Sequence, residues 1–353
     1  MLPAILGVSG LSLTPDERDF IRDADPFGFI LFRRNIESPE QTTRLIDELS
    51  EATDGRRVMP VLVDQEGGRV QRLRPPHWVD LPHVRAIGDL YMRDPEKGIL
   101  AARLQAQCIA GMLLECGFTT VCAPVLDVPV PGAHDVIGNR AFSEKAETVA
   151  TLATIMTEEF LHCGLTPILK HAPGHGRATS DSHYACPVVS ESCAILDQTD
   201  FLPYRQVLKT VDPSTVWAMT AHVVYTDIDA QPVSVSSKAI THLRNGLGLS
   251  GLIIPDAIEM EALGGTLVER ALATLNAGCD VTMYCAGNLD EAKKIAVALP
   301  TMTQEAMGCA EEAEDWRQCN SNAEWRECYK QLRELIPQQE AYLYEQHQAL
   351  NVA

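Results

Sequence analysis

The chain of 353 residues is 46% hydrophobic, which is enough to bury a large core in two domains or in one α/β barrel. Its formal net charge of −19 at pH 7, from 29 Lys and Arg against 48 Asp and Glu, argues against binding to a nucleic-acid backbone. No apolar stretch suits a membrane span, and the N-terminal apolar run lacks the basic start of a signal peptide, so we expect a cytoplasmic protein without membrane attachment.

The cysteines favour a reducing compartment. Eleven are scattered along the chain without any Cys-x-x-Cys pair, so a structural zinc site is not expected. Five of them lie inside apolar runs and are expected to be small core residues: Cys108, Cys116, Cys122, Cys279 and Cys285.

Eight short apolar runs are predicted to be buried strands. They cover residues 4–8, 27–32, 59–63, 119–126, 165–169, 216–221, 252–254 and 280–284. Apolar residues at helical spacing predict helices between most of these runs, at residues 41–52, 99–116, 145–163, 237–247 and 267–277. Gly117, Gly164 and Gly278 stand where helix C-caps belong. The alternation predicts one α/β domain, a (β/α)8 TIM barrel or a close variant, with a doubly wound open sheet as the competing fold.

Polar residues that follow the predicted strands favour the barrel. Charged, amide or imidazole side chains stand at the ends of six of the eight runs: Arg33, Arg34, Asn35, Asp64, Asp127, Lys170, His171, His222 and Asp256. Any buried strand must end in something polar, so one or two such endings would mean little. In a barrel, however, these ends converge on the face where active sites lie. Six endings therefore predict a site there.

Two loops carry candidate binding residues. Residues 64–72 read Asp-Gln-Glu-Gly-Gly-Arg-Val-Gln-Arg, and the paired glycines either let the backbone approach a ligand closely or form a plain turn. Neither nucleotide-binding glycine pattern occurs there. In the second loop, Arg140 would hold hydroxyls or a carboxylate, or clamp the loop.

The stretch 165–183 concentrates the chemistry, because an apolar run opens into a long loop that carries Lys170, His171, His175, Asp181 and His183. Asp181 lies two residues before His183, so its carboxylate can orient the imidazole, which exchanges a proton near neutral pH. A solvated turn or a disordered loop is the alternative.

Asp256 ends the seventh run as an isolated carboxylate, with Glu259 three residues later. Such a carboxylate can act as a nucleophile at an anomeric carbon or bind a metal. The Asp-x-x-Glu pattern on its own fits better the cap of a following helix.

Beyond residue 299 the chain becomes polar, with surface helices expected at 305–314 and 323–335 and a helical or frayed tail at 338–353. We therefore expect one barrel domain at residues 1–300 and a helical extension at 301–353 that packs on the barrel or trails from it.

Together these motifs resemble glycoside hydrolase family 3, and within it the single-domain bacterial β-N-acetylglucosaminidases, or β-hexosaminidases, of peptidoglycan recycling. The resemblance spans residues 3–299. Its specific parts are residues 64–73, 123–127, 137–142, 170–183 and 219–222, and Asp256.

The resemblance implies a retaining mechanism, with Asp256 as nucleophile, His183 as general acid and then base, and Asp181 orienting His183. It also implies which residues hold the hydroxyls and N-acetyl group of the terminal sugar: Asp64, Arg72, Arg140, Lys170 and His171. Roles in the site's framework are expected for His175 and His222. No metal or cofactor is expected.

The chain departs from the family at the nucleophile. Where members usually carry Ser-Asp-Asp-Leu, it has Pro255-Asp256-Ala257-Ile258, and it has Ala172 where Phe usually follows Lys-His. Loss of the second Asp removes a charge that can hold the first in place or shift its pKa. A weakly active or non-catalytic N-acetylglucosamine-binding homologue is therefore one alternative.

A metal-dependent barrel hydrolase is the other alternative, because the zinc-ligand types His and Asp recur at the expected site, as His171, His175, His183, His222 and Asp256. An aromatic content of 6% gives little material for stacking along a polysaccharide, so a small soluble glycan is the expected partner. By resemblance this glycan is N-acetylglucosamine β-1,4-linked to an anhydro-muramic acid peptide, and a monomer is expected to cleave it.

Overall fold

Eight parallel strands form the centre of the structure, a computed structural model that describes residues 1–56, 58–182, 184–318 and 324–337. They are β1 (Leu2–Leu6), β2 (Pro26–Leu31), β3 (Val61–Val63), β6 (Thr120–Val121), β7 (Thr166–Ala172), β9 (Trp217–Thr220), β11 (Ile253–Pro255) and β12 (Thr282–Tyr284). Their order is β11-β9-β7-β6-β3-β2-β1-β12, and every paired neighbour is parallel. Each strand matches one of the eight predicted runs.

The sheet closes nearly completely, which confirms the barrel and excludes the open sheet. No strand ladder joins β11 to β12, but two backbone hydrogen bonds bridge the gap. The Asp280 N–H donates to the Ile253 carbonyl at 2.9 Å, and the Ile258 N–H donates to the Met283 carbonyl at 3.0 Å. The strand ends therefore form one ring, as a shared site at its mouth requires.

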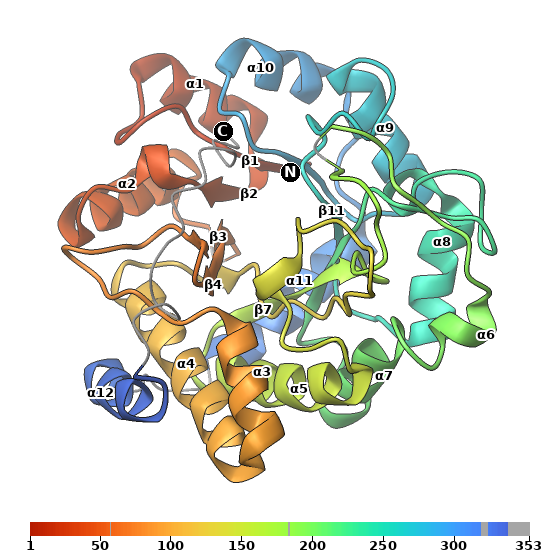
Figure 1. Cartoon of the computed structure of the whole chain (residues 1–353). Coiled ribbons are helices and arrows are strands. Elements are labelled where there is room, and N and C mark those ends of the chain that lie inside the picture. The colour runs from red at the N-terminus through yellow and green to blue at the C-terminus, as the bar shows by residue number, and fades with distance from the viewer. Residues whose placement is uncertain (57, 183, 319–323, 338–353) are drawn as a thin grey trace.

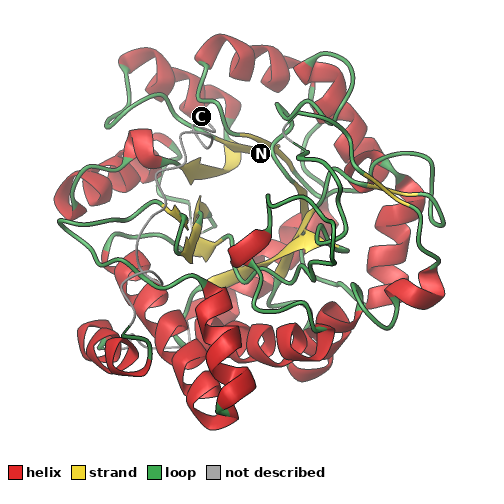
Figure 2. Cartoon of the chain, viewed as in Figure 1, coloured by secondary structure: helices red, strands yellow, loops and turns green. Residues whose placement is uncertain are grey.

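Helices surround the barrel in a ring (Figures 1 and 2). They are α1 (Pro15–Ala24), α2 (Pro39–Ala52), α3 (Val84–Arg93), α4 (Pro95–Glu115), α5 (Ala146–His162), α6 (Cys193–Leu196), α7 (Leu202–Thr210), α8 (Ser237–Thr241), α9 (Leu267–Ala277) and α10 (Leu289–Ala298). Local sequence explains their ends. Thr14 and Glu17 form a capping box on α1, and Gly278 ends α9 with φ at +107°. Gly117 and Gly164 likewise adopt positive φ directly after α4 and α5, as predicted.

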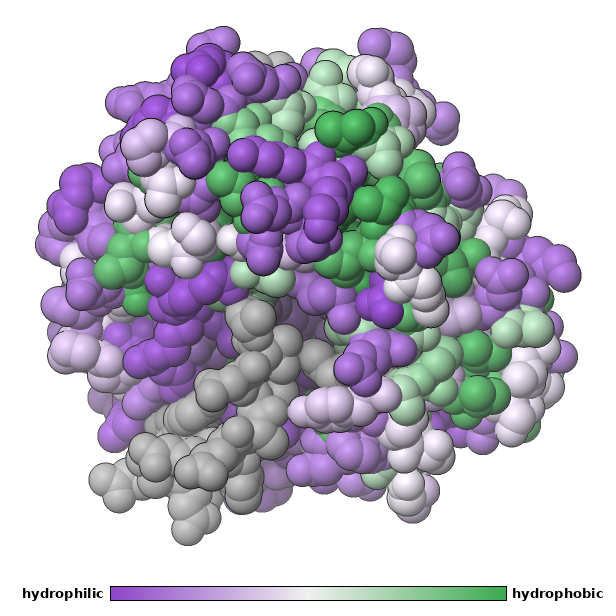
Figure 3. Space-filling view, turned by 90° about the horizontal axis from the view of Figure 1, so that it is seen from above, coloured by the Kyte–Doolittle hydropathy of each residue, from purple (hydrophilic) through white to green (hydrophobic). Residues whose placement is uncertain are grey.

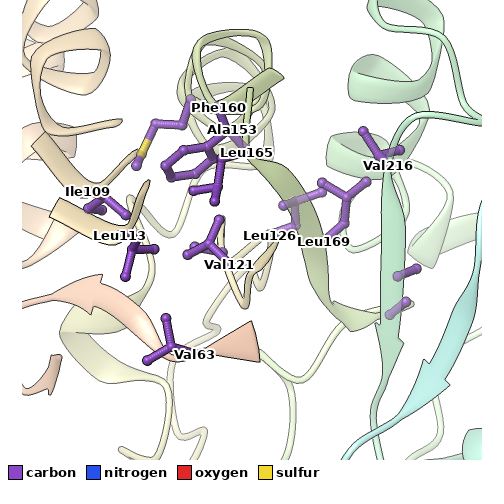
Figure 4. Close-up of a cluster of buried hydrophobic side chains, with 14 of the residues drawn as sticks. Val63, Ile109, Leu113, Val121, Leu126, Ala153, Phe160, Leu165, Leu169 and Val216 are labelled. Atoms are coloured by element: carbon purple, nitrogen blue, oxygen red, sulfur yellow. The ribbon is translucent and has the colours of Figure 1, made fainter. Parts of the chain in front are cut away.

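Two hydrophobic layers hold the barrel together. One fills its interior, where Ile30, Leu62 and Ile254 lie among the inward-facing residues. The other lies between the strands and the outer helices. Figure 4 shows part of it: Val63, Ile109, Leu113, Val121, Leu126, Ala153, Phe160, Leu165, Leu169 and Val216. The ten described cysteines are free, and those predicted for the core are buried.

The helical extension packs against the barrel. Helix α11 (Gln304–Gln318) lies behind the strands in Figure 1 and covers the end of the barrel at which the strands begin. Its small residues Ala306, Ala310 and Ala313 join the interior layer, so the stretch expected at the surface buries one face. Helix α12 (Trp325–Leu335) packs on α4. The expected tail at 338–353 lies outside the described residues.

Short elements decorate the opposite end. Strands β4 (Gln65–Gly67) and β5 (Val70–Gln71) form an antiparallel hairpin after β3, and β8 (Val188–Val189) pairs in parallel with β10 (Val224–Tyr225). Single turns occur there at η1 (Arg33–Asn35), η2 (Gly138–Arg140) and η3 (Val233–Val235). The π-helical η4 (His242–Leu247) instead continues α8 toward the start of β11. The side of the molecule in Figure 3 is mostly hydrophilic, with hydrophobic residues in patches. Within the described ranges, no helix is long and apolar enough to cross a membrane.

Candidate active site

The carboxyl ends of the barrel strands surround a cavity of about 310 Å³. Six residues predicted from the sequence line it: Asp64, Arg72, Arg140, Lys170, His171 and Asp256. A larger cavity of about 680 Å³ lies outside the barrel, between α4, α5 and α11, and contains none of them. The polar strand ends therefore converge as the barrel prediction required, and the chemistry lies in the smaller cavity.

An ion-pair network forms one wall of this cavity. Lys170 is 2% exposed, and its Nζ lies 2.9 Å from Asp64 Oδ1 and 2.6 Å from Glu66 Oε1. Arg72 donates to Asp64 Oδ2 at 2.9 Å, and Arg140 donates through Nε and Nη2 to both oxygens of Glu66, each at 2.9 Å. Five side chains from three separate segments, residues 64–72, η2 and β7, thereby fix one another in place.

Charge attraction keeps this network ionised. Burial alone would raise the pKa of Asp64, but Lys170 and Arg72 outweigh burial and hold that pKa well below its ordinary value. Burial also opposes ionisation of Glu66, yet Arg140 and Lys170 lower its pKa to about 2. Burial would lower the pKa of Lys170, but both carboxylates raise it above its ordinary value. The wall therefore presents fixed charges that suit the hydroxyl and amide groups of a sugar.

An irregularity in β7 brings two consecutive residues to the cavity. Its register with β9 shifts between Lys170 and Ala172, so Lys170 and His171 both line the cavity instead of alternating between faces. Asp127, fully buried, accepts from the His171 backbone N–H at 3.1 Å and contacts His171 Nδ1 at 2.7 Å. Arg140 Nη2 lies 3.4 Å from His171 Nε2 and can only donate, so the hydrogen of His171 is on Nδ1.

Asp256 follows β11 directly and faces the cavity from the other side. Its backbone N–H donates to the Thr220 carbonyl at 3.1 Å, and its Oδ1 accepts from the Ala257 N–H at 2.8 Å. His222 Nε2 donates to the Ala257 carbonyl at 3.0 Å, while its Nδ1 accepts from the Ser234 hydroxyl at 2.6 Å. His222 thus supports the backbone next to Asp256.

The helix-cap interpretation of Asp256 and Glu259 is wrong. The next helix, α9, begins at Leu267 and is capped by Thr266, far beyond either carboxylate. Glu259 instead lines the cavity, and its Oε1 accepts from the Cys285 N–H at 2.8 Å after β12. This long-range contact turns the segment after β11 into part of the cavity wall.

The loop after β7 is anchored through Ser182, which is 2% exposed. Its Oγ lies 2.9 Å from Nε2 of the buried His175, whose backbone N–H donates to Asp127 at 2.7 Å. Burial lowers the pKa of His175 to about 4, so this ring is neutral at pH 7. Asp181 is half-buried and accepts through its carbonyl from the Tyr184 N–H at 3.0 Å, as in a turn. His183 lies outside the described residues.

Some predicted polar residues lie away from the cavity. Arg33 is exposed, and buried Asn35 donates to the carbonyls of Val8 and Gly10. Among the residues that the structure describes, no three His, Cys, Asp or Glu side chains form a group suited to a metal ion.

Two carboxylates of the site were not predicted from the sequence as site residues: Glu66, in the ion-pair network, and Glu259, in the wall with Asp256. Glu66 lies in the 64–72 motif, where the paired glycines and the flanking Asp64 and Arg72 were the predicted features. The sequence signal for Glu66 was its place as a charged residue before Gly-Gly, just after a predicted strand. For Glu259 the sequence carries only its distance of three residues from Asp256.

Comparison with known proteins agrees with this geometry. The family model described as "Glycosyl hydrolase family 3 N terminal domain" matches residues 6–310. A beta-hexosaminidase from Bordetella avium (strain 197N) is 36% identical over 286 residues, 80% of each chain. One from Alkalilimnicola ehrlichii is 33% identical over 351 residues, 97% of this chain and 98% of the relative.

A solved structure also has this fold. NagZ from Neisseria gonorrhoeae in complex with N-trifluoroacetyl-D-glucosamine matches with a TM-score of 0.84 at 28% identity, covering 95% of this chain and 98% of that one. The family model spans most of the chain, and the two relatives match it over 80% and 98% of their own length. The chain therefore belongs to glycoside hydrolase family 3 and is a glycosidase of the β-hexosaminidase type.

Proposed function

We propose that the protein is a retaining β-N-acetylglucosaminidase that removes terminal N-acetylglucosamine through a covalent intermediate on Asp256. The observation that carries this proposal is the gathering of Asp256 and the paired charges of Asp64, Arg72, Arg140 and Lys170 around one cavity. At about 310 Å³ the cavity lies at the lower end of the range for ligand sites, which suits a single sugar unit.

The first step forms the glycosyl-enzyme. A carboxylate oxygen of Asp256 attacks the anomeric carbon while the bond to the leaving oxygen breaks, and His183 donates its proton to that oxygen. Asp181 orients the imidazole. Positive charge develops on the sugar ring during the attack, so negative charge beside Asp256 favours the transition state.

The second step releases the sugar. Water gives a proton to His183 and attacks the anomeric carbon from the side the leaving group vacated, which frees the Asp256 carboxylate and retains the anomeric configuration. The binding roles fall to Asp64, Arg72, Arg140, Lys170 and His171. Their interlocked hydrogen bonds support this assignment, because a preformed wall does not have to be ordered when substrate binds.

The proposed natural substrate is N-acetylglucosamine β-1,4-linked to an anhydro-muramic acid peptide, a small soluble wall fragment of peptidoglycan recycling. We further propose that the enzyme works in the cytoplasm as a monomer, without cofactor, nucleic acid or membrane partner. The six proposed residues that line the cavity belong to one chain, which supports a complete site in each copy. Light scattering of the purified protein tests the monomer.

The proposed function is tested with the disaccharide peptide itself. Proton NMR at early times should detect the β-anomer of N-acetylglucosamine as the first product, because two displacements at one carbon retain configuration. First formation of the α-anomer would rule out a glycosyl-enzyme. Binding of N-acetylglucosamine without any turnover would instead identify a sugar-binding homologue, the alternative that Pro255 and Ala257 leave open.

A further inference from the structure

Glu259 lies in the same wall of the cavity as Asp256, three residues further along the chain. Its Oε1 accepts from the Cys285 backbone N–H at 2.8 Å, at the end of β12. A hydrogen bond to the backbone of another barrel strand fixes the carboxyl group in position. Its location therefore follows from the fold and not from a flexible side chain at the surface.

The second oxygen of Glu259 has no such contact. Oε2 is shielded from solvent and has no hydrogen-bond partner of ordinary geometry among the described residues, although the Ala286 backbone N–H is near enough to oppose part of the rise in the pKa of Glu259. Among the residues that the structure describes, no Lys or Arg nitrogen lies within 4 Å of the Glu259 carboxylate. Lys170, Arg72 and Arg140 pair instead with Asp64 and Glu66, across the cavity.

We propose that Glu259 is the charge partner of Asp256: its ionised carboxylate adds negative charge beside the nucleophile and favours the positively charged transition state. This inference rests on the proposed function. This chain has Ala257 directly after Asp256, where the family usually carries a second Asp. In the inference, Glu259 supplies the second carboxylate near the nucleophile. Glu259 acts through its field on the reaction centre and needs no contact with the sugar.

The neighbours of Glu259 make its charge depend on pH near neutrality. Burial, with a further contribution from Asp256, raises the pKa of Glu259 to about 7. From β12 and the residue after it, Tyr284 and Cys285 face this carboxyl. Burial raises the pKa of Tyr284 to about 12 and that of Cys285 well above its ordinary value, so both are neutral at pH 7.

Arg34, in η1, is a cation that interacts electrostatically with Glu259. It donates through Nε to the Val8 carbonyl and through Nη2 to the Cys285 carbonyl. Arg34 forms no ion pair with Glu259 within 4 Å among the described residues, although the two charges still attract each other. The ionised fraction of Glu259 is therefore expected to rise through about pH 7, and the rate of glycosyl-enzyme formation with it.

The test measures kcat/KM against pH for an activated aryl β-N-acetylglucosaminide, whose leaving group needs no proton. The wild-type enzyme should show a rising limb with an apparent pKa near 7. Glu259→Gln should remove this limb and lower the plateau by about tenfold, the effect of one nearby charge in a partly shielded site. Glu261→Gln, an equal charge change in the same wall, should leave the limb in place.

Each outcome decides a different claim. An unchanged limb in Glu259→Gln would overturn the inference, while hydrolysis by the wild type would still support the proposed function. No hydrolysis by the wild type at any pH would defeat the proposed function itself. Should Glu259→Gln lose its cooperative melting transition, Glu259→Ser removes the same charge with less volume, and the same loss of the limb is expected.

Discussion

Ser182 Oγ lies 2.9 Å from His175 Nε2 and ties the loop after β7 to the floor of the site. The same serine accepts through its carbonyl from the Ala262 N–H at 3.2 Å, on the segment that follows Asp256. In the sequence Ser182 separates Asp181 from His183, the proposed acid/base pair. One buried residue thus joins the proposed acid/base segment both to His175 and to the segment that follows the proposed nucleophile, Asp256.

Replacing Ser182 should weaken both folding and catalysis. Ser182→Ala leaves a buried ring nitrogen of His175 without its partner, which we expect to lower the free energy of unfolding by about 1–3 kcal/mol. Turnover of glycosides with poor leaving groups should fall more than turnover of activated ones, because only the former need a well-placed proton donor. Urea unfolding and kcat/KM measure the two effects.

Two variants serve as controls for Ser182→Ala. Ser182→Thr retains a hydroxyl and should keep most of the activity. Thr179→Ala changes an exposed residue of the same loop and should alter neither quantity. Equal losses in Ser182→Ala for both substrate classes would show that the serine only stabilises the fold.

Lys170 should contribute strongly to stability. Lys170→Met leaves Asp64 and Glu66 facing each other across a buried wall, so the free energy of unfolding at pH 7 should fall by about 3–5 kcal/mol. Lys294→Met is the matched control, because Lys294 is 62% exposed and pairs with Glu291 on the surface. Its urea-unfolding midpoint should stay close to that of the wild type. Similar midpoints for both variants would contradict the assignment of a buried pair.

The raised pKa of Glu259 predicts a stability change with a defined sign. The pKa rises on folding from 4.5 to about 7, so its contribution to stability is present in full below 4.5 and is lost as the pH rises through 7. Glu259→Gln cannot ionise and should therefore be more stable than the wild type at pH 8, by on the order of 1–2 kcal/mol after solvent screening. Near pH 4 the two proteins should melt alike. A gap that is constant across this range would mean that Glu259 does not titrate there.

The loss of rate on replacing His183 should depend on how strongly the leaving group needs a proton. His183→Ala is expected to slow glycosides with poor leaving groups by about 10²–10⁴-fold and activated aryl glycosides much less in the first step. Steady-state rates with a series of substituted phenols measure this dependence. A loss that is the same for every phenol would count against the acid role.

The barrel could be predicted because its signals are local. Short apolar runs between helical stretches located all eight strands, and three glycines, Gly117, Gly164 and Gly278, located the ends of α4, α5 and α9. The lengths of individual strands and helices were less predictable. The run 119–126 forms a ladder only at Thr120–Val121, since Pro124 cannot donate a hydrogen bond. Residues 237–247 form α8 and then a π-helical turn instead of one helix.

Contacts across the barrel could not be predicted from sequence. In sequence, Asp-x-x-Glu at 256–259 matches a helix cap. In the structure Glu259 instead accepts from the Cys285 N–H, which follows another strand, β12. The stretch 305–314 is polar overall, so a surface helix was predicted. Its alanines at helical spacing pack against the interior of the barrel, a surface that exists only in the folded protein. Glu66 became recognisable as a site residue only once Lys170 and Arg140 were seen beside it.

The central claim is that Asp256 is the nucleophile of a metal-independent β-N-acetylglucosaminidase. The most direct measurement is release of nitrophenol from nitrophenyl β-N-acetylglucosaminide by the wild type, with and without chelator, beside Asp256→Ala. Turnover should survive the chelator and vanish in the variant, which should still melt cooperatively and gain stability from N-acetylglucosamine. Turnover by Asp256→Ala near the wild-type rate, or its loss on chelation alone, would contradict the account.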